Sequence, residues 1–571
     1  MKKIFYFLSL LISGMVVFSL SSCSKKYEQE PEDWFTRDLT FDTLDQNGVI
    51  VGYNLNNIYT YIPNGFDRIN GDFLDDGVGE ALPSRYNTQV ENYTKGTISL
   101  TANPDPYWAN SYYGIRRATI FLKNVDRTPI NVTNKRYFKA EARFLRAYFY
   151  WELLKRYGGV PLLGDTVLTT DDRLQIPRNT FAQTVDYIVN ECIAVKDSLR
   201  PEPVADAEWG RIPRGAAVAL KCRVLLYAAS PLFNGGGIET DPVKKALTGY
   251  PTADATRWQR VADAAAEFNA LGYYGLITGG TSTTFASIFT TKKSTEIIFS
   301  KQSGNSSTLE TNQSPVGYII SNSRSLGLTS PTQNFVDAFP MANGLGINET
   351  GSGYNAATPY AGRDPRFAAT VFYNGLTWLN RGVQTYSAGL DKPDNGAVAP
   401  IQTRTGYYLR KFLGNFATST AYATQSHNFP IIRYAEIVLN HAEALNELGQ
   451  VEAAVTQINR LRARAGITAG TGSRYGIKAG ITQTEMRLLI RNERRIELAF
   501  EEHRFWDVRR WKIGDQLNNV PLNGMKITNT TPVTYQVVPV ATSVFPERMY
   551  HMPIPLDEMN KNQQLIQNEG W

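Results

Sequence analysis

Cysteine and histidine are scarce in this chain, and their positions do not match common metal-binding spacings. The 571 residues include three cysteines and four histidines. Two cysteines, Cys192 and Cys222, lie in predicted helices, where we expect small buried side chains and no disulfide. The histidines follow no HExxH pattern and accompany no cysteine cluster; they are His427, His441, His503 and His551. We therefore expect no metal centre and no cofactor.

Signatures of catalysis are also lacking. No nucleophile elbow is present, and Gly470, Gly472 and Gly476 miss the spacing of a dinucleotide-binding loop. A glycosidase needs two carboxylates about 5–9 Å apart, and no sequence motif indicates such a pair. We expect a protein that is not an enzyme, with a surface glycoside hydrolase as the alternative that the sequence leaves open.

A strong charge of one sign is missing too. Lysine and arginine total 59 against 53 acidic residues, a formal net charge of +6 that is dispersed along the chain. Nucleic acid is therefore a poor candidate as a partner. Hydrophobic residues make up 42% of the chain, so a packed core is expected.

The N-terminus has the pattern of a lipoprotein leader. Lys2 and Lys3 precede an apolar or small run from Ile4 to Leu20, which is short for a membrane span. The run ends in Leu-Ser-Ser-Cys at Cys23, which resembles the lipidation signal of bacterial lipoproteins. We predict a signal peptide at 1–22 and a flexible tether at 23–34. We also predict a lipid on Cys23, with palmitate among its acyl chains. An ordinary signal peptide with an incidental cysteine is the alternative.

Helical hairpins dominate the rest of the sequence. In Asn428–Gly466, apolar residues from Ile431 to Leu445 recur in steps of three and four, and Gly449 suits a helix C-terminus. A second apolar stripe runs from Val451 to Leu461, so two antiparallel helices are predicted. This spacing is typical of tetratricopeptide (TPR) repeats, which bury their faces by stacking. The predicted fold is therefore mainly α, a TPR-like scaffold with large irregular loops and a few short strands.

Other helices have clear start and stop signals. We predict helices at 107–125, 135–157, 181–199, 215–230, 258–271 and 482–511. The helix at 135–157 ends at Gly158 and Gly159, and the last one starts with a Thr482–Glu485 capping box. Residues 71–101 and 272–430 are rich in glycine and polar residues and are predicted to be loops.

These patterns divide the chain into regions. We predict an N-terminal helical region at 35–271 and a C-terminal region at 272–571. The latter holds a loop-rich excursion at 272–430 and helical hairpins at 431–511. We expect the regions to form one compact globule.

Several segments, in this order, resemble the SusD/RagB family of outer-membrane nutrient-binding lipoproteins. They are the Cys23 signal, YWANSYYGIRRATIFLKNVD at 107–126, KAEARFLRAYFYWELLKRYGGVPLL at 139–163, GRIPRGAAVALKCRVLLYAASP at 210–231, RNERRIELAFEEHRFWDVRRW at 491–511 and the terminal LIQNEGW. The resemblance implies a SusD-like helical fold and no catalysis. It also implies a SusC-like TonB-dependent transporter as partner, and a lipid-anchored position at the outer-membrane surface. The ligand would be an oligosaccharide or, in the RagB branch, a peptide.

The charged helix at Arg491–Trp511 and the Arg363–Arg366 turn are predicted to be structural. Glu493 and Glu497 lie one helical turn apart among arginines, which indicates ion pairs and not a catalytic pair. Trp151, Trp506 and Trp511 lie on well-patterned helices and are expected in the core.

A sugar site needs flat apolar rings for C–H faces and polar groups for hydroxyls. The resemblance points to two zones for such a platform, the loop before the helix at 107–125 and the excursion before the C-terminal hairpin. The candidate ligand-binding residues in these zones are Asp75, Asp76, Arg85, Tyr86, Tyr107, Trp108, Tyr354, Tyr360 and Trp378. Calcium at Asp72, Asp75 and Asp76 is an alternative, although their spacing is not that of an EF-hand loop.

Overall fold

The computed structural model describes residues 40–169, 171–320, 322–393, 401–414, 416 and 425–571. The predicted leader, Cys23 and the predicted tether lie outside these residues. The described chain is mainly helical, with short strands in two-stranded sheets. Among the described residues, no helix has both the length and the apolar character that a membrane span needs.

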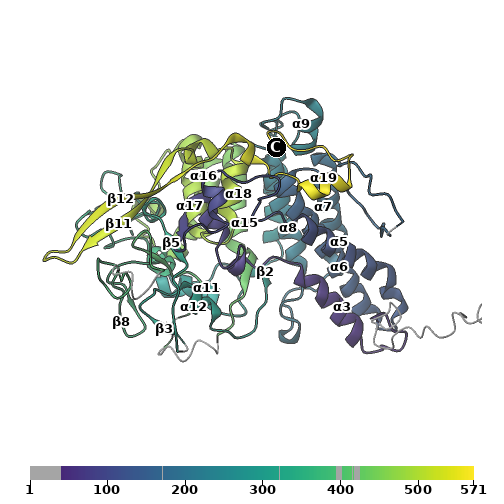
Figure 1. Ribbon diagram of the computed structural model, residues 1–571, viewed down its shortest axis with the longest axis horizontal. Coiled ribbons are helices and arrows are strands. Elements are labelled where there is room, and N and C mark those ends of the chain that lie inside the picture. Colours follow the sequence, from purple (N-terminus) through teal and green to yellow (C-terminus); the bar gives the residue numbers. More distant parts are fainter. Residues whose placement is uncertain (1–39, 170, 321, 394–400, 415, 417–424) are drawn as a thin grey trace, which may run out of the picture.

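The N-terminal part is a stack of antiparallel helices, seen in blue on one side of the molecule (Figure 1). Helices α5 and α6 pack along each other, α7 lies between α6 and α8, and α10 packs on α8. The bounds are α3 (Val49–Thr60), α4 (Glu91–Thr94), α5 (Trp108–Asn124), α6 (Val132–Tyr157), α7 (Phe181–Val195), α8 (Arg214–Ala229), α9 (Pro242–Thr248) and α10 (Arg257–Asn269).

Local sequence signals explain where several of these helices start and stop. Thr180 caps α7, and its hydroxyl accepts the amide of Gln183 at 3.1 Å, as the capping pattern requires. Helix α6 ends at Gly158, whose φ of 80° suits glycine. A Cβ at this position would lie 2.4 Å from the Leu247 carbonyl oxygen, so the position also needs glycine for space.

The C-terminal helices return to this stack. Helix α15 packs on α16, α17, α8 and α10, which joins both ends of the chain in one hydrophobic core. The bounds are α15 (Tyr434–Glu447), α16 (Val451–Ala465), α17 (Gln483–Glu497), α18 (His503–Arg510) and α19 (Leu556–Lys561). The predicted helical hairpin and the mainly α, TPR-like fold are confirmed.

Two boundaries differ from the prediction. Ile431 lies on strand β10 (Phe429–Arg433), which pairs antiparallel with β2 (Ile297–Lys301), so the helix begins only at Tyr434. The predicted helix at 482–511 is two helices, because Phe500 and Glu502 have positive φ values between α17 and α18. The Phe500 amide then donates to the Asp75 carboxylate at 3.1 Å, a contact that a continuous helix would not allow.

The excursion folds over a second hydrophobic core of short helices and strands. Its elements are α11 (Ser282–Thr290), α12 (Thr308–Gln313), α13 (Gln333–Val336), α14 (Pro365–Thr370), β3 (Ile319–Ile320), β4 (Ser323–Arg324), β5 (Thr329–Pro331), β6 (Val371–Phe372), β7 (Thr377–Trp378), β8 (Arg381–Gly382) and β9 (Tyr408–Leu409). Strand β1 (Ala81–Pro83) joins this part from the N-terminal region by pairing with β5.

The C-terminal tail contains a longer hairpin than its sequence indicated. Strands β11 (Val520–Thr528) and β12 (Thr534–Ser543) pair antiparallel along their full length, whereas the predicted fold had only a few short strands. The hairpin points away from the helical stack at the far end of the molecule (Figure 1).

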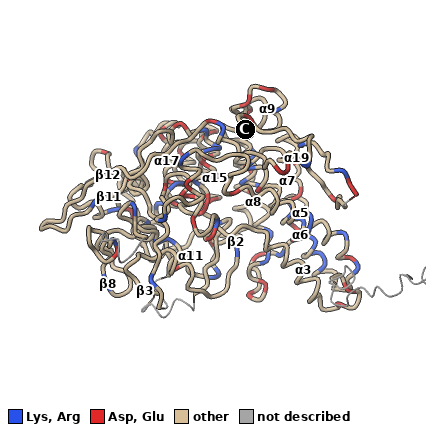
Figure 2. Tube along the Cα trace, in the orientation of Figure 1, with Lys and Arg blue, Asp and Glu red and all other residues tan. Residues whose placement is uncertain are grey.

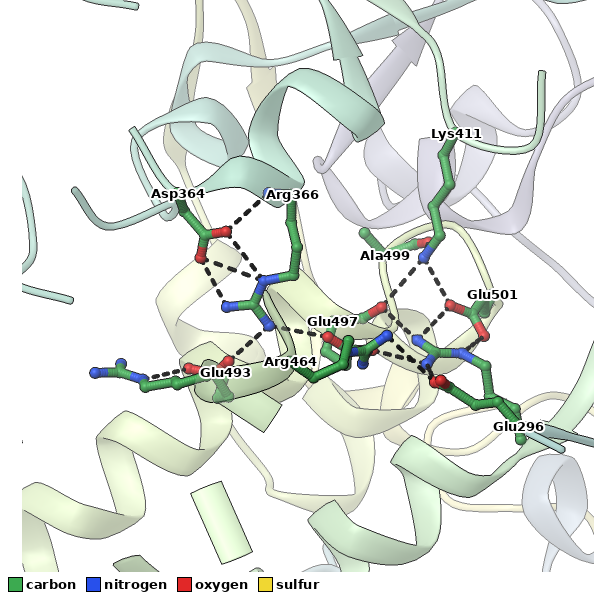
Figure 3. Close-up of polar contacts among 11 residues, drawn as sticks. Glu296, Asp364, Arg366, Lys411, Arg464, Glu493, Glu497, Ala499 and Glu501 are labelled. Carbon is green, nitrogen blue, oxygen red and sulfur yellow. Dashed lines mark hydrogen bonds and ion pairs between the residues drawn. The ribbon is translucent and has the colours of Figure 1, made fainter. Parts of the chain in front are cut away.

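A buried ion-pair network lies where the two cores meet (Figure 3). Glu497 accepts hydrogen bonds from Arg433 at 2.7 Å, from Arg366 at 2.9 Å and from Arg464. Burial alone would raise the pKa of Glu497, but the three arginines hold it well below its ordinary value. The predicted structural role of this charged helix is therefore confirmed.

The Arg363–Arg366 turn is also held by internal contacts. Asp364 accepts the guanidinium of Arg366 at 2.7 Å, and Arg363 donates to the carbonyl of Val336 at 2.7 Å. The other residues expected inside are buried as well; these are Trp151, Trp506, Trp511 and the free cysteines Cys192 and Cys222.

Candidate functional site

The pairing of β1 with β5 brings the two predicted ligand zones together. Pro83 lies opposite Thr329, and the Ser84 amide donates to the Leu328 carbonyl at 2.7 Å. All residues of both strands are buried, so this pairing is a fixed part of the interior. The chain that leaves β1 at Arg85 and Tyr86 therefore emerges beside the segment that enters β5.

Tyr86 is the exposed aromatic residue of this junction. Its side chain is 71% exposed, and the Cζ atom of Arg404 lies 4.5 Å from the centroid of its ring. Arg404 is itself fixed, since it donates to Glu91 at 2.6 Å and to the Pro83 carbonyl at 3.2 Å. Cation–π contact and these hydrogen bonds hold a largely open ring in place.

Hydrogen bonds link Arg85, the chain neighbour of Tyr86, to polar groups of the same region. Arg85 donates to the Asn70 carbonyl and to Asp72, both at 2.8 Å, and the Asn70 amide donates to Gln89 at 3.1 Å. Burial raises the pKa of Asp72 although Arg85 opposes this shift. Amide, guanidinium and ring thus occur together at one surface, which suits a ligand with both apolar faces and hydroxyl groups. We name the surface formed by Asn70, Arg85, Tyr86, Gln89 and Arg404 the Tyr86 surface.

Two acidic groups pair with the cations of this region. Burial would raise the pKa of Glu91, but hydrogen bonds from Arg404 and Lys95 lower it overall. Asp72 forms an ion pair with Arg85 at 2.8 Å. The Tyr86 surface therefore has its charges paired, as a binding surface for neutral hydroxyl groups would need.

Asp75 and Asp76 lie beneath this surface and not on it. The Asp75 carboxylate accepts a hydrogen bond from the Phe500 amide, and the Asp76 carboxylate accepts one from the Phe73 amide, each at 3.1 Å. Both side chains are at most 1% exposed. Burial raises the pKa of Asp75 to about 8 and that of Asp76 well above its ordinary value. In the part of the chain that the structure describes, no three histidine, cysteine or acidic side chains group as a metal site requires.

Tyr107 and Trp108 belong to the helical scaffold. The Tyr107 hydroxyl donates to the Tyr61 carbonyl, and the guanidinium of Arg156 lies over its ring at 5.1 Å. Trp108 is 5% exposed and packs edge-on against Tyr157 at 5.1 Å. The structure thus places both rings in packing contacts.

The three candidates from the excursion, Tyr354, Tyr360 and Trp378, are not part of the Tyr86 surface. Trp378 is 2% exposed and packs between Tyr318 and Phe372, with its centroid 5.0 Å from each ring. Tyr360 is half-buried, and its centroid is 4.5 Å from that of Tyr373. Tyr354 is also half-buried, with Arg363 5.6 Å from its centroid. Of the nine predicted ligand-binding residues, Arg85 and Tyr86 are the two that lie on the Tyr86 surface.

Arg404 is the residue of this surface that the sequence analysis missed. It lies 318 positions from Tyr86, in a loop that has no motif, and its backbone amide donates to the Ser330 hydroxyl at 3.2 Å. Only the pairing of β1 with β5 brings it over the ring. No local sequence signal could have indicated this contact.

Comparisons with known proteins agree with the architecture. The model of the SusD family matches residues 295–571, and a SusD-like model described as starch-binding and associating with the outer membrane matches residues 43–226. SusD-like protein P2 of Formosa agariphila is 24% identical over 510 residues, which cover 88% of this chain and 86% of that protein.

Solved structures show the same fold. A SusD-like protein from Bacteroides fragilis superposes with a TM-score of 0.76 at 29% identity, covering 93% of this chain and 98% of that one. A second protein from Bacteroides fragilis, described as a SusD-like carbohydrate binding protein, gives a TM-score of 0.71 at 21% identity and covers 90% and 98%.

Both matching models belong to a family of non-catalytic binding proteins. The family is one of carbohydrate-binding proteins that associate with the outer membrane. This chain belongs to the SusD family.

Proposed function

We propose that this protein is a surface lipoprotein that captures an extracellular oligosaccharide and delivers it to a SusC-like TonB-dependent transporter. The observation that carries the proposal is the exposed ring of Tyr86, fixed by Arg404 where two distant loop zones meet. The carbohydrate-binding family, and the carbohydrate-binding protein from Bacteroides fragilis that shares the fold, support the class of ligand.

The chemistry of capture follows from the Tyr86 surface. One face of a sugar ring carries C–H groups that pack against an aromatic ring, and the hydroxyl groups then need donors and acceptors. Arg85, next to Tyr86 in the chain, and the exposed Asn70 and Gln89 that are linked to it offer such groups. Because Arg404 already holds the ring, little conformational freedom is lost when the ligand binds.

The test is a titration of the protein from residue 24 onward with a panel of neutral and acidic polysaccharides, and with peptides. We expect saturable binding of at least one saccharide, measured by isothermal calorimetry, and no release of reducing ends. Binding of peptides alone would assign the protein to the RagB-type alternative. Turnover of a bound glycan would establish the glycoside hydrolase alternative.

The anchor and the partner need separate tests. A Cys23→Ala variant is expected in the soluble fraction of cells whose wild-type protein sediments with outer membranes. Affinity capture of the anchored protein from detergent extracts is expected to retain a large TonB-dependent transporter. Capture of no such transporter would remove the delivery step from the proposal and leave capture of the ligand.

A further inference from the structure

A groove of about 660 Å³ lies among α5, α6 and α7, in the helical stack. Four of its cationic residues come from α6 at steps of three, four and three, which places them on one face of that helix. Figure 2 shows lysine and arginine along α5 and α6, on the side of the molecule away from the β11–β12 hairpin. The five cationic residues of the groove are Lys123, Arg136, Lys139, Arg143 and Arg146.

Carboxylates neutralise only part of this charge. Arg143 is bonded to Glu191 through two contacts of 2.8 and 3.0 Å, and Lys139 pairs with Asp126 at 2.7 Å. Across the described residues, no carboxylate lies within 4.0 Å of Lys123 or Arg136. Both side chains are exposed, so the rim of the groove carries two unpaired positive charges.

The floor of the groove holds a third cation with an unused donor. Arg146 is only 4% exposed and donates to the Gly164 carbonyl at 3.0 Å and to Asp165 at 2.7 Å. Its Nε atom has no hydrogen-bond partner among the described residues, although buried donors are nearly always satisfied. Its partner Asp165 is 83% exposed, and a second carboxylate, that of Glu191, lies 3.6 Å from the Nη2 atom of Arg146.

We propose that this groove binds an acidic saccharide, through carboxylate or sulfate groups on its sugar rings. Guanidinium groups match the planar, multidentate oxygens of such groups. Leu122, which is half-buried on α5, gives the groove some apolar surface for the C–H face of a ring. The volume lies within the range of small-ligand sites, which is about 300–1,000 Å³. The choice of a saccharide rests on the proposed function, whereas the preference for an anion rests on the groove alone.

The test uses dextran sulfate, polygalacturonate and neutral dextran as probes of the full soluble chain. We expect Lys123→Gln with Arg136→Gln to weaken binding of the two acidic polymers at least about tenfold, and to leave neutral dextran unaffected. Binding to the wild type should also weaken as salt rises from about 20 to 300 mM. Both substituted side chains are exposed, so folding should not change.

Matched controls separate this groove from the Tyr86 surface. Lys292→Gln with Lys526→Gln removes the same charge at exposed positions outside the groove and should leave the affinity unchanged. Tyr86→Ala should leave the salt-sensitive binding of acidic polymers in place. If no neutral saccharide binds but acidic polymers bind through the groove, the Tyr86 platform fails and this proposal stands.

Four outcomes would overturn the proposal. The first is that neither acidic polymer binds, and the second is that the Lys292 and Lys526 control variant loses as much affinity as the Lys123 and Arg136 variant. The third is that the Lys123 and Arg136 variant keeps its affinity for the acidic polymers. The fourth is that this variant loses affinity only for phosphatidylglycerol vesicles, used as an additional probe. The last result would assign the groove to lipid phosphates and not to a saccharide.

Discussion

Arg433 and Glu497 meet in the interior, with the Nη1 atom 2.7 Å from the Oε1 atom, and both side chains are at most 1% exposed. Arg433 ends strand β10 and Glu497 ends α17, so the pair fastens the strand to the helical scaffold. Arg366 reaches the same carboxylate from α14 in the excursion. One carboxylate thus joins the helical part to the loop-rich part that supports the Tyr86 surface (Figure 3).

Replacing Glu497 by Gln should therefore destabilise the whole protein. The change leaves the charges of Arg433, Arg366 and Arg464 without this carboxylate in the interior, and breaking one partner of a buried pair costs about 3–5 kcal/mol. Urea denaturation would give the loss in the free energy of unfolding. The matched control is Glu452→Gln, where the carboxylate is 65% exposed and pairs with Arg474, and where we expect little or no change in stability. Similar losses in both variants would show that burial of the network does not matter.

Asp75 should make stability depend on pH in the direction opposite to a paired carboxylate. Its pKa is about 8 in the folded protein because burial disfavours the charge, against about 3.9 in an unfolded chain. Between these values the folded state holds a proton that the unfolded state has lost, so stability should fall as pH rises from 5 to 8. Asp75→Asn keeps an oxygen for the Phe500 amide and removes this titration. Its melting temperature should therefore fall less over that pH range, and equal slopes in both proteins would contradict the assignment.

Gly158→Ala should destabilise the end of α6. The residue has a φ of 80°, and the added Cβ would meet the Leu247 carbonyl oxygen, so we expect a loss of about 1–3 kcal/mol. Gly52→Ala is the control, because Gly52 lies inside α3 and a Cβ there has open space. Alanine is the better helix former, so this control should be neutral or stabilising by up to about 1 kcal/mol. The melting temperatures of the two variants and the wild type, measured by thermal unfolding, test this expectation.

Sequence reasoning predicted those features that local contacts create. The Gly158 end of α6, the left-handed Gly449 and the Thr482–Glu485 capping box all act within a few residues, and all are present. The break between α17 and α18 was missed because its partner, Asp75, lies 425 positions away from Phe500. Strand β10 was missed for the same reason, since β2 pairs with it across more than a hundred residues.

The candidate site was harder to predict than the fold. The family resemblance pointed to two zones, and β1 with β5 brings them together, but loop composition does not determine which side chains face inward. Trp378 and Asp76 are in segments that were predicted to be loops, yet tertiary packing buries both. Arg404 could not be chosen, because a single arginine in a loop has no pattern that connects it with Tyr86.

Tyr86→Ala should weaken binding of a neutral saccharide by about 1–2 kcal/mol, or roughly five- to thirtyfold in Kd, because it removes the stacking face. Tyr86→Phe keeps the face and should retain most of the affinity. Tyr53→Ala is the matched control, since Tyr53 is 69% exposed on α3 and lies outside the Tyr86 surface. Trp108→Phe should also leave the affinity unchanged, because that ring packs against Tyr157. Calorimetric titration with the saccharide that binds the wild type measures all four variants. Equal affinity of Tyr86→Ala and the wild type would exclude Tyr86 as the platform, whereas a loss in the Trp108 variant alone would move the platform to the mouth of α5.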